Sequence, residues 1–139
     1  MLALAVVLGG CAAPQPTEID YRCVLPNTLA FDFASDLATL FGNAIAEKAH
    51  LQILNTTRLK GSAANDVTYI VSLKSTNVEG LFVNVLFNRP YRTIAVTISG
   101  DIRNPEANLI AEDAVKSFSE VFPGSKLTLF SGNQALFGP

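Results

Sequence analysis

Three consecutive stretches decide the fold: VTYIVSL at residues 67–73, LFVNVLF at 81–87 and TIAVTIS at 93–99. Each stretch is rich in β-branched and aromatic residues, and the first and third alternate apolar and polar side chains, which predicts β-strands with one buried face. The connections at 76–80 and 88–92 are short, so we expect the three strands to run antiparallel. The middle stretch is apolar on nearly both faces, and we expect it in the centre of the sheet.

Two amphipathic helices flank these strands. Apolar residues recur at three- and four-residue steps over about residues 33–49 and again over 105–122, and each segment keeps one polar side. Asp32 and Asn104 are the expected N-caps, and Pro105 takes the first helical position of the second helix. We expect Gly42, inside the first helix, to let another element approach closely.

Shorter patterns complete the expected order of elements. Period-two alternation predicts a strand at 19–24, a second is expected at 51–59, and residues 126–130 fit a short last strand. The order is therefore β-α-β-β-β-β-α-β. Each helix has one apolar stripe to bury, and the economical solution places both helices on the same face of the sheet. The sequence thus predicts an α+β two-layer sandwich with two helices on one face of a mainly antiparallel sheet.

The second helix supplies part of the expected core. Its apolar stripe contains Ile110, Val115 and Phe118, which recur at helical spacing. We expect these three side chains to pack on the sheet rather than to form a contact surface.

Composition limits the functional classes. The chain has 139 residues, the length of one domain, and its 49% hydrophobic content excludes a disordered chain. Ten Lys+Arg against twelve Asp+Glu give a net charge of −2, so no basic excess exists to neutralise a phosphate backbone and no nucleic-acid partner is expected. With two cysteines and one histidine, we expect no zinc site of the Cys/His type and no cofactor.

The N-terminal stretch has the features of an export signal. Residues 2–8 read LALAVVL, a run of seven that is too short for a hydrocarbon core that needs about 20 helical residues. It matches the apolar region of a signal peptide. The alternative is that residues 1–10 form the first turns of a helix or strand. No basic residue precedes Arg22, so we expect the true start to lie a few codons upstream.

Leu8-Gly9-Gly10-Cys11 resembles the lipobox of bacterial lipoproteins. The resemblance implies removal of residues 1–10 and lipid attachment, including palmitate, at Cys11. Residues 11–18 contain the modified cysteine and a linker with two prolines and no charge before Glu18, and a single domain follows at 19–139. By the same resemblance, alanine rather than aspartate at position 12 implies a lipid anchor in the outer membrane with the domain on the periplasmic side.

Candidate catalytic residues are few. His50 is the only histidine and is expected at the end of the first helix, where it would meet free carbonyl groups. Cys23 shares its strand face with Ile19 and Tyr21, so we expect it to be buried and unable to form a dyad with His50. No Gly-x-Ser-x-Gly motif occurs, and the Glu112–Asp113 pair is expected on a solvated helix face. These observations predict that the chain is not an enzyme. The alternative is a small envelope hydrolase with an unrecognised active site.

One turn gathers unusual chemistry. Arg89, Tyr91 and Arg92 flank Pro90, so two cations and an aromatic ring lie within five residues. They are candidate contacts for anionic lipid, lipopolysaccharide or a partner protein. The alternative is a solvated hairpin tip. Because both charges are expected at a loop tip, changing both arginines to serine should alter stability by about half a kcal/mol or less.

The lipobox and the element order together resemble a loose set of small envelope-assembly lipoproteins. Examples are the lipopolysaccharide-assembly lipoprotein, the curli-assembly lipoprotein and the N-terminal domain of the Tol-system propeller protein. The resemblance covers about residues 19–122, and it assigns no role to any residue. It implies a membrane-anchored periplasmic lipoprotein that serves as a non-catalytic binding or assembly module, with an envelope protein or a glycolipid as partner.

Overall fold

The computed structural model of the chain describes residues 18–26, 34–63, 66–89 and 91–130. The expected signal peptide, the candidate lipid site Cys11 and the expected N-cap Asp32 lie outside the described residues. The elements are β1 (Glu18–Val24), α2 (Ala34–Ala49), β2 (Leu51–Lys60), β3 (Val67–Ser75), β4 (Leu81–Asn88), β5 (Thr93–Gly100), α3 (Pro105–Val121) and β6 (Thr128–Leu129). Among the described residues, no helix is long and apolar enough to cross a membrane.

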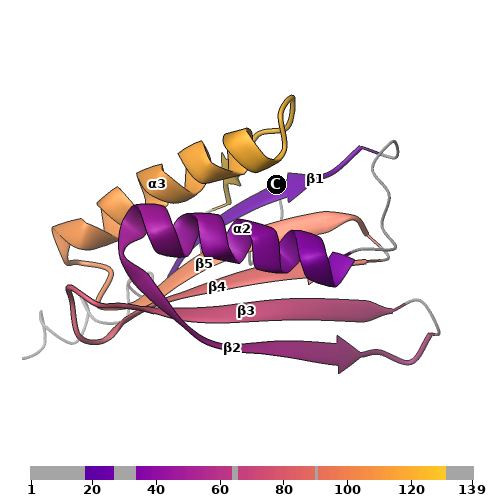
Figure 1. Cartoon of the computed structure of the whole chain (residues 1–139), viewed down its shortest axis with the longest axis horizontal. Coiled ribbons are helices and arrows are strands. Elements are labelled where there is room, and N and C mark those ends of the chain that lie inside the picture. Colours follow the sequence, from indigo (N-terminus) through magenta and orange to yellow (C-terminus); the bar gives the residue numbers. More distant parts are fainter. Residues whose placement is uncertain (1–17, 27–33, 64–65, 90, 131–139) are drawn as a thin grey trace, which may run out of the picture.

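The strands form one antiparallel sheet in the order β2-β3-β4-β5-β1-β6. Both helices lie on the same face of this sheet, α2 over β2, β3 and β4 and α3 beside it (Figure 1). The predicted α+β two-layer sandwich is therefore confirmed. β4 lies inside the sheet, as its apolar sequence indicates, and β6 is shorter than the strand expected at 126–130.

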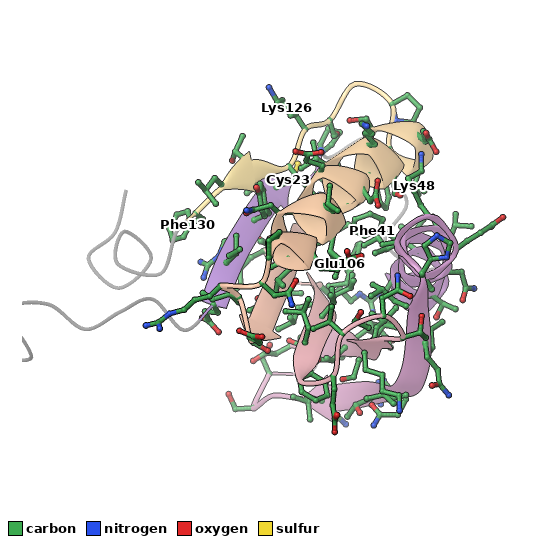
Figure 2. All side chains as sticks on the ribbon, turned by 90° about the vertical axis from the view of Figure 1, so that its left-hand side faces the viewer. Cys23, Phe41, Lys48, Glu106, Lys126 and Phe130 are labelled. Atoms are coloured by element: carbon green, nitrogen blue, oxygen red, sulfur yellow. The ribbon has the colours of Figure 1, made fainter. Side chains whose placement is uncertain are left out.

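The core fills the space between the helices and the sheet. Alternate residues of β3, β4 and β5 are buried on the helix side, whereas their neighbours on the other face stay partly exposed. Phe41 of α2 lies between the two helices (Figure 2). Its ring meets those of Phe118 and Phe122 edge-on, with centroids 5.3 and 6.1 Å away. Such edge-to-face contacts add to the stabilisation that burial alone provides.

The second helix has the expected orientation. Asn104 caps it by accepting a hydrogen bond from the Glu106 backbone, and Pro105 follows at the first position. Ile110 and Phe118 are fully buried, and Val115 is half-buried against the same core. The helix thus presents to the sheet the stripe that its sequence predicts.

Gly42 marks the closest approach of α2 to the sheet. A Cβ built at this position would lie 2.9 Å from Cγ1 of Val71 on β3. Valine has a stiff side chain and cannot easily move away, so an alanine here would be overpacked. The close approach expected at Gly42 is confirmed, and the approaching element is β3.

Replacing Phe118 by alanine should lower the free energy of unfolding by about 3–5 kcal/mol, because a fully buried ring leaves a cavity between the two helices. That is a large part of the roughly 5–15 kcal/mol that stabilises a domain. Leu109→Ala is the matched control, since Leu109 lies on the same helix with 51% of its surface exposed and should cost about half a kcal/mol. Urea unfolding measures both, and equal midpoints would contradict the orientation of α3.

Candidate functional site

On the face of the sheet opposite the helices, side chains of similar polarity lie in rows across neighbouring strands. The strand register aligns outward residues of β3, β4 and β5 in rows. A row of Lys74, Phe82 and Ser99 lies at one end, and three successive rows follow it toward the other end: Ser72, Asn84 and Thr97; Ile70, Leu86 and Ala95; Thr68, Asn88 and Thr93. The first and third of these three successive rows are polar and uncharged, and the middle row is apolar. We call this surface, which neither α2 nor α3 covers, the open face.

Cross-strand hydrogen bonds order the polar rows. Ser72 Oγ donates to Asn84 Oδ1 at 2.8 Å, and Asn88 Nδ2 donates to Thr68 Oγ1 at 2.9 Å. Asn88 Oδ1 also accepts from the backbone N–H of Tyr91 at 3.2 Å, which ties the following turn to this row. Hydroxyl–amide pairs across neighbouring strands stabilise a sheet modestly and fix side-chain orientation.

A groove of about 620 Å³ lies at one end of the open face. It is lined by four strands and one turn through Arg22, Val24, Thr68, Leu86, Asn88, Tyr91, Thr93 and Ala95. Leu86, Ala95 and Val24 supply apolar surface, while the threonines and Asn88 supply uncharged polar atoms. Arg22 is the one charged residue of the lining. The groove can therefore hold a ligand that is part apolar and part polar.

Two residues of the turn that follows β4, Tyr91 and Arg92, have different roles. Tyr91 is 75% exposed and lines the groove. Arg92 instead turns back onto β1, where its guanidinium donates to the backbone carbonyls of Leu25, at 3.4 Å, and of Pro26. The Leu25 N–H in turn donates to the Arg92 carbonyl at 2.8 Å. Arg92 therefore fastens the end of β1, and Tyr91 is the residue of this turn that borders the groove.

Arg22 was not among the residues expected at a site. Its Nε and Nη2 donate to Asp20 Oδ2 at 3.0 and 2.8 Å, and its guanidinium lies 4.2 Å from the ring centroid of Phe130. These contacts hold the cation in one place at the border of the groove. The available signal was the alternation along β1, which places Asp20 and Arg22 together on the face opposite Ile19.

Asp20 is unusual for a residue on the open face. It is only 4% exposed, and among the described residues its Oδ1 atom has no hydrogen-bond partner. Burial of a carboxylate is costly unless it is paired, and here the pairing comes from Arg22 through the other oxygen. Arg22 thus stabilises Asp20 as well as bordering the groove.

The two candidate catalytic residues lie far apart. Cys23 is on β1 and His50 directly precedes β2, so β3, β4 and β5 separate them and the distance is at least four strand spacings, or roughly 19 Å. Burial raises the pKa of the Cys23 thiol, and a backbone hydrogen bond at Lys126 lowers it in part. His50 has a left-handed backbone, with φ 56°, and its carbonyl accepts from the Thr76 backbone and hydroxyl. The structure brings no Cys–His dyad together.

The acidic side chains on α3 and just before it do not converge on one point. Glu112 and Asp101 are exposed, and Asp113 is half-buried on the outer side of α3. Within the described part of the chain, no group of three or more His, Cys, Asp and Glu side chains could hold a metal ion. The groove on the open face is therefore the strongest candidate site in these parts of the molecule.

Comparison with known proteins gives a distant similarity. No family model matches the sequence, and no curated protein matches it. A solved structure of the adenosylmethionine decarboxylase from Aquifex aeolicus is similar with a TM-score of 0.47 and 11% sequence identity. The match covers 84% of this chain and 90% of that chain.

This similarity corrects one expectation. The sequence predicted that the chain is not an enzyme, and a solved structure to which it is similar is that of an enzyme. The physical reason for the error is that a fold does not determine whether chemistry takes place on it, so the scarcity of familiar motifs was too weak an argument. At this TM-score and identity the match gives no argument that the present chain shares the decarboxylase reaction.

The contacts of Arg92 change the expected cost of replacing it. Arg92→Ser should lower the free energy of unfolding by about 1 kcal/mol, because the carbonyls of Leu25 and Pro26 lose a charged donor in a partly exposed setting. Tyr91→Ala, in the same turn but 75% exposed, should change it by about half a kcal/mol or less. Thermal melts of the two variants test this. If Arg92→Ser melts like the Tyr91→Ala variant, the turn is the solvated tip of the alternative reading.

Proposed function

We propose that this chain is a lipid-anchored binding or assembly module of the cell envelope, and that its partner contacts the groove on the open face beside Tyr91. The observation that carries the proposal is the groove itself, an apolar floor bordered by polar side chains and Arg22 on a face that neither α2 nor α3 covers. A mainly apolar concave surface with a few placed polar groups is the usual form of a binding site.

The lining defines the chemistry of the partner. Leu86 and Ala95 offer an apolar floor, and Thr93 and Asn88 offer hydrogen-bonding groups at its border. Arg22 adds one fixed cation, whose charge is partly balanced by its ion pair with Asp20, and the lining itself contains no acidic residue. A protein segment or a glycolipid that presents apolar surface next to a polar or anionic group matches this pattern.

The geometry of β1 favours a protein partner over a lipid of the same membrane. Six residues separate Cys11 from Glu18, so an anchor at Cys11 would keep the start of β1 within about 25 Å of the bilayer surface. β1 runs from Glu18, opposite Ser99, to Val24, opposite Thr93. The groove lies at the Val24 end of β1, so it would face the periplasm when the sheet stands upright on the membrane.

Cys11→Ala should abolish labelling by a clickable palmitate analogue in cells that express the chain from a functional start. The reason is that the lipobox resemblance assigns Cys11 as the acylated thiol. Cys23→Ala is the matched control and should keep full labelling, because Cys23 lies within the folded sheet. Labelling that survives in the Cys11 variant would remove the basis of the anchor.

The same cells test the membrane. The wild-type chain should sediment with outer-membrane markers on a sucrose gradient, since alanine follows Cys11. Ala12→Asp should shift it to the inner-membrane fraction by resemblance to lipoprotein sorting signals. Wild-type protein in the inner-membrane fraction would contradict outer-membrane sorting while leaving the lipid anchor in place.

A photo-crosslinking amino acid at Tyr91 should trap the partner in intact cells, because this side chain borders the groove and is 75% exposed. The same probe at Leu109, on the outer side of α3, is the matched control and should trap little. Addition of Leu86→Ser should reduce trapping from Tyr91 several-fold by removing apolar floor. Protease and lipid extraction of the product distinguish protein from glycolipid, and equal trapping at both positions would contradict the groove as the site.

A further inference from the structure

The two edges of the sheet differ greatly. At one edge β6 pairs only two residues with β1. At the other edge β2 is ten residues long, and among the described residues no strand lies on its outer side (Figure 1). Residues 54–60 of β2 are exposed along their whole length. A long free edge can pair with another extended chain through its unpaired N–H and C=O groups.

The hydrogen bonds at the two ends of β2 tell which residues point outward. The Thr76 N–H donates to the His50 carbonyl, and the Gly61 N–H donates to the Asp66 carbonyl. Bonded and non-bonded pairs alternate in an antiparallel ladder, and the irregularity between Ile53 and Asn55 absorbs one residue. The alternation counted from the His50 end and from the Gly61 end assigns the same residues of β2 to hydrogen-bonded pairs with β3.

Beyond the irregularity, Asn55, Thr57 and Leu59 exchange hydrogen bonds with β3, following the register. Thr56 and Arg58, together with Lys60, therefore direct their backbone N–H and C=O groups away from the sheet. These three residues form a regular, accessible stretch, which we call the free edge of β2.

The free edge carries a distinct charge pattern. Arg58 and Lys60 are two residues apart, so their side chains share one face, and both are exposed. β2 contains no acidic residue, and no ion pair joins either cation to another described residue. The other face of the strand, at Thr57 and Leu59, is uncharged.

We propose that the free edge of β2 accepts, as an added antiparallel strand, an extended acidic segment of a partner protein. Carboxylates at alternate positions of that segment would lie opposite Arg58 and Lys60, where opposite charges across neighbouring strands are favourable. Small apolar or hydroxyl side chains at the positions between would lie beside Thr57 and Leu59. Backbone hydrogen bonds would supply affinity, and the two cations would supply selectivity.

A second copy of the chain fits this edge poorly. The antiparallel self-pairing that uses all three outward residues places Thr56 opposite Lys60 and Arg58 opposite Arg58 of the second copy. Like charges directly opposite one another destabilise a strand pair. The cations thus discourage self-association and favour a partner of opposite charge.

A capped, fluorescein-labelled peptide, Thr-Val-Glu-Val-Glu-Val-Thr, is the probe, and the same peptide with lysine in place of glutamate is its control. Anisotropy titrations use the full mature chain in a Cys11→Ser background. The glutamate peptide should bind at least tenfold tighter than the lysine peptide, and Arg58→Glu with Lys60→Glu should reverse this preference. Absence of selectivity, or of its reversal, would overturn the proposal.

A backbone test separates strand addition from simple charge attraction. Thr56→Pro removes an outward N–H without touching the β3 ladder, and proline is tolerated at such an edge position. It should weaken binding of the glutamate peptide at least fivefold with an unchanged thermal melt, whereas Thr56→Val should bind like wild type. Equal binding by both variants would overturn strand addition. A dimer in sedimentation that Thr56→Pro dissociates would make the occupant a second copy and would also overturn it.

This inference stands apart from the groove. Tyr91 lies on the turn between β4 and β5, and Tyr91→Ala should leave peptide binding at β2 unchanged. Crosslinking from Tyr91 and anisotropy at β2 can therefore fail independently.

Discussion

The whole arrangement depends on the burial of two helical stripes against a single face of the sheet. Phe41 from α2 and Phe118 from α3 meet above the strands, and this contact fixes the helices beside one another. With α2 and α3 on one side, neither helix supplies an apolar layer for the opposite face to pack against. The polar side chains of that face must then find hydrogen-bond partners among themselves. The cross-strand hydrogen bonds of Ser72 to Asn84 and of Asn88 to Thr68 meet this need. One-sided packing is thus the reason that an accessible, hydrogen-bonded surface exists at all.

Order on the open face gives the groove its character as a candidate site. Leu86 and Ala95 are held in register by the ladders on either side, and Arg22 is held by Asp20 and by the ring of Phe130. A ligand that meets groups already fixed in place loses less binding free energy to ordering than one that meets mobile side chains. The strand ladders therefore fix the positions of the groove side chains before a ligand binds, as the packed core around an enzyme pocket fixes the side chains that line it.

The periodicity of apolar residues was sufficient to predict the fold but not to predict the candidate site. In a strand or helix that buries one face, apolar residues recur with a period of two or of about 3.6 residues. Residues such as Ile110 and Phe118 could therefore be assigned to the core from spacing alone. The groove depends instead on register across four strands, which no local pattern encodes. The backward turn of Arg92 onto Leu25 and Pro26 likewise joins segments 66 residues or more apart. The irregularity between Ile53 and Asn55, which decides the outward residues of β2, has no recognisable signal in the sequence.

The two proposed contact surfaces share one end of the sheet. Register relates Arg58 to Tyr69, Tyr69 to Phe87, Phe87 to Ile94 and Ile94 to Cys23, so the cations of β2 lie level with the last residues of β1. The proposed anchor at Cys11 would lie toward the other end, where β1 begins at Glu18. Anionic lipid attracts lysine and arginine within about a Debye length of the surface, roughly 8–10 Å, and the length of β1 places both surfaces beyond that range when the sheet stands away from the membrane. In that orientation the cations would not be drawn to the bilayer and would remain accessible to an acidic segment from the periplasm.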